Sequence, residues 1–268
     1  MRFAAAVGSG QIAFDVLGAG APLAMLHDFG ESSEFWRESG YVEACLAHGR
    51  QVVLVDLRGH GDSSKPTDPS AYGPISTGRD IIAVLNEAGI ERADLLGYGM
   101  GGWIALCAAS VAPERVHAVA AGGAHPFAEV MQSYREALTK GLELWIRYIE
   151  TRSGELSPAT RSRLLANDPR ALAAAVECDR PDMADAVAAS SVPLLLFLGK
   201  DDPRYPLALS FAEESEARVI GLAAHDHLTT AAAARAEILP RVLEFFDQPE
   251  HCVPKERPPI GLWSGSWA

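Results

Sequence analysis

The chain is poor in cysteine and in basic residues, and it has no long apolar run. Its four cysteines are widely spaced and form no Cys-x-x-Cys pair: Cys45, Cys107, Cys178 and Cys252. This spacing argues against a zinc site or a disulfide framework and favours reduced thiols in a cytoplasm. No run approaches the roughly 20 apolar residues that a membrane helix needs. The 23 Lys and Arg against 35 Asp and Glu give a net charge of -12, which disfavours nucleic acid and anionic membranes as partners.

The first residues contain a single basic side chain, and Gly8-Ser9-Gly10 interrupts their apolar stretch. We therefore expect no secretory signal and a cytoplasmic location. The 268 residues, 48% hydrophobic and 22% charged, are typical of a globular protein with a large core. Because α/β folds of this length commonly form one domain, a single domain is predicted.

Short apolar runs alternate with longer helical patterns along most of the chain. The expected strands are 11–16, 22–27, 51–56, 94–98, 116–121, 193–199 and 218–222. The expected helices are 33–48, 76–88, 101–112 and 230–246. This alternation predicts a mostly parallel sheet covered by helices on both faces, with a core formed by 1–124 and 190–247.

From 125 to 189 the pattern is helical only. Apolar residues recur there every three or four positions, as expected for one helix face: Phe127, Met131, Tyr134, Leu138, Leu142, Trp145 and Ile149. We expect this face to pack on its neighbours and, as the underside of a helical lid, to line a pocket. The candidate substrate contacts are Tyr134, Leu138 and Trp145, together with Asp28 from outside this segment. Arg135 or Arg147 could hold a substrate carboxylate.

The tail 248–268 is rich in Pro and Gly and lacks periodicity, so that an extended or partly disordered end is predicted. Its Trp263 and Trp267 could dock on the body of the chain or on a second subunit. A homodimer therefore stays open as a partner arrangement.

The segment Gly97-Tyr98-Gly99-Met100-Gly101 lies between an expected strand and an expected helix. In a G-x-S-x-G nucleophile elbow the turn is so tight that the residues two positions to either side must be small. Gly97 and Gly101 meet this demand, whereas Gly99 stands where the reactive serine is expected. Other interpretations of the glycines fail, because no carboxylate ends the next strand, as a dinucleotide site requires, and no Gly-Lys-Ser/Thr follows.

At these residues the chain resembles the α/β-hydrolase fold family, in particular its lidded esterase, lactonase and carbon–carbon hydrolase branch. Further segments agree in type and order. His27-Asp28-Phe29-Gly30 is similar to the His-Gly-x-Gly oxyanion loop, and Asp56-Leu57-Arg58-Gly59-His60-Gly61-Asp62-Ser63 is similar to a D-x-R-G-x-G-x-S loop. Asp202 after a late strand and His227 before the last helix follow in the family's order.

The resemblance implies hydrolysis of a small to medium carboxylic ester, lactone or related acyl substrate, without cofactor or metal. His227 is implied as general base and Asp202 as the carboxylate that orients it, with His225 and Asp201 as neighbouring alternatives. The backbone amides of Phe29 and Met100 would form the oxyanion hole.

Asp28 departs from the family, which usually has glycine at this position. A carboxylate beside the oxyanion hole would repel developing negative charge. The favoured interpretation is that Asp28 points away into solvent, and the alternative is that the local chemistry is unusual.

A glycine cannot attack a substrate, so the acyl-enzyme route is closed to this chain. Three hypotheses follow. The natural protein has serine and Gly99 is an inactivating substitution; or Gly99 is natural and His227 with Asp202 acts as general base for a water or in a lyase-type step; or the chain is a non-catalytic binding module for a small molecule.

Overall fold

The computed structural model describes residues 1–233 and 235–248. The predictions for Cys252, Trp263 and Trp267 lie outside the described residues. Among the described helices none has the length and apolar character needed to cross a bilayer.

An eight-stranded sheet runs through the described part of the chain in the order β1-β2-β4-β3-β5-β6-β7-β8. The β1–β2 and β2–β4 pairs are antiparallel, and the remaining pairs are parallel. The strands are β1 (Arg2–Ala5), β2 (Gln11–Leu17), β3 (Ala21–Leu26), β4 (Arg50–Val55), β5 (Ala93–Tyr98), β6 (Val116–Gly122), β7 (Leu194–Gly199) and β8 (Arg218–Leu222). The predicted α/β-hydrolase fold is confirmed.

Strand β1 is absent from the expected strands. It is a four-residue edge strand in which only Ala4 is buried, so its sequence carries no alternation that could reveal it. The other strands begin and end within one residue of the expected bounds, because each is a short apolar run bounded by turn residues.

The helices agree less closely with the sequence patterns. They are α1 (Glu34–Glu38), α2 (Tyr41–Ala47), α3 (Pro74–Glu87), α4 (Met100–Val111), α5 (Gln132–Thr139), α6 (Leu142–Ser153), α7 (Pro158–Leu165), α8 (Pro169–Glu177), α9 (Ala184–Ala189), α10 (Tyr205–Glu214), α11 (His227–Ala233) and α12 (Arg235–Phe246), with 3₁₀ turns at Pro69–Tyr72 and Pro113–Arg115. The single helix expected over 33–48 is wrong: Gly40, with a φ of 73°, separates α1 from α2. The helix expected over 230–246 corresponds to α11 and α12, and α10 was not expected.

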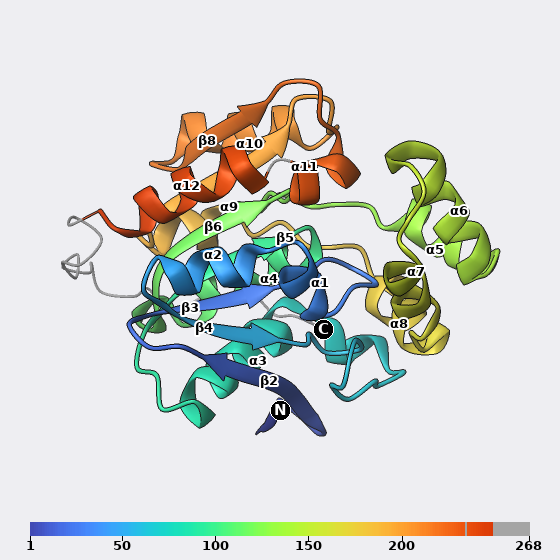
Figure 1. Ribbon diagram of the computed structural model, residues 1–268, viewed down its shortest axis with the longest axis horizontal. Coiled ribbons are helices and arrows are strands. Elements are labelled where there is room, and N and C mark those ends of the chain that lie inside the picture. The colour runs from blue at the N-terminus through green and yellow to red at the C-terminus, as the bar shows by residue number, and fades with distance from the viewer. Residues whose placement is uncertain (234, 249–268) are drawn as a thin grey trace.

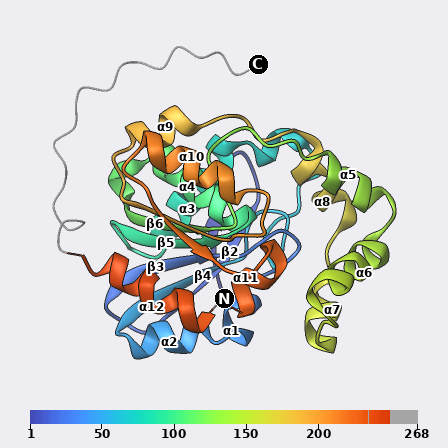
Figure 2. The ribbon, with the colours of Figure 1, turned by 90° about the horizontal axis from the view of Figure 1, so that it is seen from above.

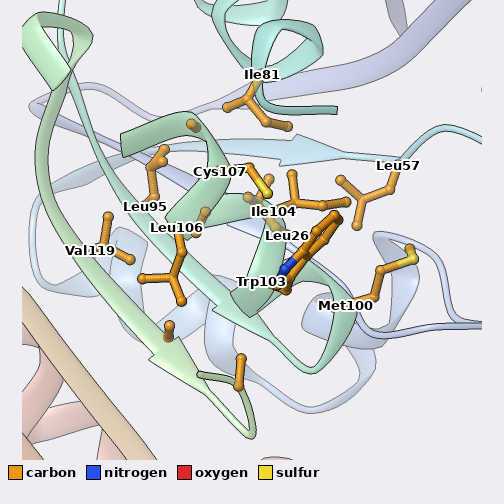
Figure 3. Close-up of a cluster of buried hydrophobic side chains, with 14 of the residues drawn as sticks. Leu26, Leu57, Ile81, Leu95, Met100, Trp103, Ile104, Leu106, Cys107 and Val119 are labelled. Atoms are coloured by element: carbon orange, nitrogen blue, oxygen red, sulfur yellow. The ribbon is translucent and has the colours of Figure 1, made fainter. Parts of the chain in front are cut away.

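Helices cover both faces of the sheet (Figures 1 and 2). Seen from above, α3, α4 and α10 lie on one side, and α1, α2 and α12 on the other. Figure 3 shows side chains of α4, among them Trp103, Ile104 and Cys107, packed between Leu26 of β3 and Ile81 of α3. Because α4 is buried over most of its surface, the strand-to-helix turn that precedes it is held in one position.

Helices α5 to α9 lie between β6 and β7 in the sequence, and α5 to α8 stand beyond the carboxyl ends of the parallel strands (Figure 1). This agrees with the helical pattern over 125–189, where the one strand-like feature described is an isolated bridge between Glu129 and Arg180. The prediction of one continuous helix face is wrong, because Gly141, with a φ of 90°, lies between the end of α5 and the start of α6. That the segment acts as a lid stays a prediction.

Candidate active site

The turn between β5 and α4 has the geometry of a nucleophile elbow. Gly99 has a φ of 52° and a ψ of -112°, a conformation that side chains adopt only under strain. Its N–H donates to the carbonyl of Gly122 at 2.8 Å. A Cβ on Gly97 would overlap with the carbonyl of Gly101, and one on Gly101 would overlap with the carbonyl of Leu26. The small residues predicted on either side of the turn are therefore required by backbone contacts.

The carboxylate of Asp28 lies inside the expected oxyanion hole. Its Oδ1 accepts the N–H of Phe29 at 2.7 Å and the N–H of Met100 at 2.9 Å. The same oxygen is where a Cβ on Gly99 would lie, so the two groups would overlap. The interpretation that Asp28 points away into solvent is wrong. The N–H groups of Phe29 and Met100 donate to this carboxylate, and hydrogen bonds to an anion are strong. They stabilise the negative charge of Asp28 in the oxyanion hole.

His227 lies between two carboxylates. Its Nδ1 is 3.0 Å from Oδ2 of Asp202, and its Nε2 is 3.2 Å from Oδ2 of Asp28. Asp202 is fully buried and also accepts the N–H of Arg204 at 2.9 Å. The Tyr98 hydroxyl donates to the carbonyl of His227, and the two rings lie 5.1 Å apart. The structure thus brings Gly99, His227 and Asp202 together as the sequence predicted, and adds Asp28 to them.

The alternatives to these two residues do not enter this arrangement. The Nδ1 of His225 is buried without a partner, and the carbonyl of His225 accepts the N–H of Asp201. Among the described residues no group of three or more His, Cys, Asp or Glu side chains is arranged to hold a metal ion.

The two carboxylates fix the protonation of His227. An ionised carboxylate only accepts hydrogen bonds, so both ring nitrogens must donate and the ring is an imidazolium. Burial by itself would lower the pKa of His227, but the hydrogen bonds to Asp202 and Asp28 raise it to about 9. Burial likewise would raise the pKa of Asp28, but the hydrogen bond and charge of His227, with the two amides, lower it to about 2.

Replacement of Asp28 by Asn is expected to lower the pKa of His227 by at least about one unit, because an opposite charge in hydrogen-bond contact is removed. The raised pKa contributes stability that is complete below the unfolded value of 6.5 and is lost as the pH rises through about 9. In Asp28→Asn the loss of stability at alkaline pH should be smaller and should occur at lower pH. NMR titration of the ring protons and urea unfolding between neutral and alkaline pH measure both effects.

The matched control is Asp15→Asn. Asp15 pairs with Arg37 and with the terminal amine of Met1 and touches nothing in the site. The Asp15→Asn substitution should leave the pKa of His227 unchanged. An unchanged His227 pKa in Asp28→Asn would show that the two side chains are not in contact in solution.

A cavity of about 1060 Å³ opens above the His227–Asp28 pair. Its walls come from the loop after β3, from α5 to α7 and from the segment around Arg204. They include the side chains of Asp28, Phe29, Tyr134, Trp145, Arg163, Arg204 and His227. Phe29 packs edge to face against both Tyr134 and Trp145, with ring centres 5.5 and 5.7 Å apart. Tyr134 and Trp145 therefore line the cavity as expected.

Two expectations for the cavity are wrong. Leu138 is absent from its walls and packs against the hydrophobic core cluster. Arg135 binds Asp179 and the carbonyls of Val176 and Glu177. Arg147 is also absent from the walls.

Sequence reasoning missed the cations that do line the cavity, which are Lys140, Arg163 and Arg204. Arg204 binds Glu129 through Nε and lies 3.5 Å from the Tyr134 hydroxyl, and Arg163 binds Glu31 and Glu38. Each partner is far away in the sequence, so no local pattern could have identified them. Arg163 and Arg204 thus already hold carboxylates.

Residues 21–208 match the family model described as the alpha/beta hydrolase fold, and the chain belongs to that family. An epoxide hydrolase from Caballeronia sordidicola is 36% identical over 102 residues, which cover 38% of this chain and 30% of that protein. The chain spans less than half the length of the first curated relatives it matches.

Solved structures agree on the fold. The enol-lactonase from Burkholderia xenovorans LB400 superposes with a TM-score of 0.78 at 20% identity, over 92% of this chain and 100% of that one. The bottromycin epimerase, in complex with bottromycin A2, superposes with a TM-score of 0.73 at 20% identity, over 91% and 98%. At this identity the likeness concerns the fold alone, and the fold hosts more than one reaction.

Proposed function

We propose that the chain is a hydrolase of a small to medium organic substrate that works without a nucleophile at the elbow. His227, oriented by Asp202, would be its proton-transfer group. The observation that carries this proposal is the 3.0 Å contact between His227 Nδ1 and the buried Asp202 carboxylate, placed at the floor of the cavity. A histidine held in this way is the usual acid–base group of an active site.

We infer that glycine is the natural residue at position 99 and not an inactivating substitution. A serine there would need the space that Asp28 occupies. An active serine enzyme would also keep its oxyanion hole open for the substrate, whereas in this chain both amides are taken by Asp28. Gly99 and Asp28 are thus two departures that fit each other. For the same reason a carbonyl oxygen of an ester or lactone could enter the hole only after Asp28 left it.

The test is turnover of a small panel: p-nitrophenyl acetate and butyrate, γ-butyrolactone and styrene oxide. At least one should be hydrolysed, and His227→Gln should lower that rate by about 10²–10⁴-fold, the usual contribution of a general acid–base group. Asp15→Asn, with its surface ion pair, serves as the control that should retain the rate. Turnover that survives in His227→Gln would refute the role of this side chain.

A second function is favoured by one observation, the filled oxyanion hole. A chain that has closed its hole with its own carboxylate could use the cavity to bind a small molecule without changing it. In that case none of the panel would be hydrolysed, whereas a bound compound would raise the melting temperature.

A further inference from the structure

We propose that Asp28 is the covalent nucleophile of this site: a carboxylate that attacks an sp³ carbon of an epoxide and forms an alkyl ester. The reactive group would thus be carried by the loop after β3 and not by the elbow. This inference rests on the proposed function, because it uses His227 as the proton-transfer group.

The two oxygens of Asp28 have different surroundings. Oδ1 is held by the amides of Phe29 and Met100, so its position is fixed by backbone. Oδ2 contacts His227 at 3.2 Å, and the side chain keeps 23% of its surface exposed at the floor of the cavity. One oxygen is therefore anchored by backbone, and the other is paired only with His227 in a side chain that lines the cavity.

An acid–base role for Asp28 fits this arrangement poorly. A useful general base has a pKa near the working pH, whereas the hydrogen bonds and charge around Asp28 hold its pKa at about 2. The group is thus ionised at any physiological pH and binds a proton too weakly to serve as a general base. A permanently ionised carboxylate can still attack carbon, and carboxylates serve as nucleophiles in several enzyme classes.

The first step balances with the groups at hand. Oδ2 of Asp28 forms a bond to the epoxide carbon, and the strained carbon–oxygen bond breaks. The leaving oxygen takes the proton of His227. The products are a hydroxyalkyl ester on Asp28 and a neutral imidazole.

This alkylation also prepares the second step. The ester carries no charge, so one of the two carboxylates that hold the proton on His227 is lost and the pKa of the ring falls. His227 can then take a proton from water, and the hydroxide attacks Cγ of Asp28. The negative charge develops on Oδ1, between the N–H groups of Phe29 and Met100, which are already in hydrogen-bond contact with that atom.

Collapse of this intermediate restores the starting state. The bond between Cγ and Oδ2 breaks, so that Oδ2 departs with the substrate carbon as an alkoxide. The alkoxide takes the proton of His227, and the diol leaves. The acid proton left on Asp28 then passes to His227. One epoxide and one water have become one diol, with both side chains returned to their charged forms.

Single turnover in ¹⁸O-labelled water tests the proposal with the unmodified protein. With protein in excess over styrene oxide, the label should appear in the Asp28 peptide, because water attacks Cγ, and the first diol should be unlabelled. Direct attack of water on the epoxide would instead label the diol and leave the peptide unlabelled. That outcome overturns the nucleophile but keeps the proposed function.

A trapped ester gives the second measurement. His227→Gln lacks both the acid of the first step and the base of the second. Phenacyl bromide, whose bromide leaves without a proton, should still alkylate this variant, and the intact mass should increase by one phenacyl group, mapped to Asp28. Asp28→Asn/His227→Gln is the matched control and should show no adduct, with near-ultraviolet circular dichroism confirming that both variants are folded. An adduct on Glu31 or Glu38, or the absence of an adduct with phenacyl bromide, overturns the proposal.

Discussion

The double substitution Asp28→Gly/Gly99→Ser is expected to give the chain a p-nitrophenyl esterase activity at least about 10³-fold above that of either single variant. The reason is steric and electrostatic at once. Removal of the Asp28 side chain frees the amides of Phe29 and Met100 and vacates the space that a side chain at position 99 needs. The serine would then meet His227, which Asp202 already orients.

The single variants should fail for opposite reasons. Gly99→Ser alone places its Cβ on the Asp28 carboxylate, so the serine is displaced or the hole stays occupied. Asp28→Gly alone has an open hole but no nucleophile. Hydrolysis is followed by release of p-nitrophenolate, and burst kinetics report the acyl-enzyme. Full esterase activity in Gly99→Ser alone would favour the hypothesis of an inactivated serine enzyme and would contradict the blocking of the oxyanion hole by Asp28.

Gly101→Ala is expected to lower the free energy of unfolding by about 3 kcal/mol or more. A Cβ at this position would overlap with the backbone carbonyl of Leu26, and neither β3 nor α4 can move away, since both are buried in the core. A loss of this size corresponds to a fall in melting temperature of about 6–12 °C for a domain near this size. Urea unfolding and calorimetry measure the two quantities.

The matched control for this prediction is Gly73→Ala. Gly73 has a φ of -67°, and a Cβ there would meet no atom closer than 3.9 Å. Its substitution should change the stability by less than about 1 kcal/mol. Similar losses in both variants would mean that the close approach of α4 to β3 does not limit the residue at position 101.

Much of the fold could be predicted from the sequence because its signals are local. The buried strands β3 to β7 are short apolar runs, and each is followed by a turn that its own residues specify. The small residues at 97 and 101 likewise predicted the tight turn. Where a helix is interrupted by a single glycine, as at Gly40 and Gly141, the periodic pattern continued across the break and the prediction failed.

Of the candidate site, too, some features could be predicted from the sequence and others could not. The order of Gly99, Asp202 and His227 along the chain, with the strand or helix beside each, is similar to that of the family, and this resemblance predicted that they meet. The sequence could also say that Asp28 was unusual. It could not say where the carboxylate points, because that depends on Phe29 and Met100, which follow different strands and offer two amides to one oxygen.

What the sequence alone determined is the class of fold, the elbow and the absence of a side chain at its tip. Only the tertiary structure decided that Asp28 fills the vacated place and that His227 lies between two carboxylates. The physical reason is that hydrophobic periodicity and turn preferences act between neighbours in the chain. A hydrogen bond or a charge contact acts between whatever groups folding brings within about 3 Å of each other.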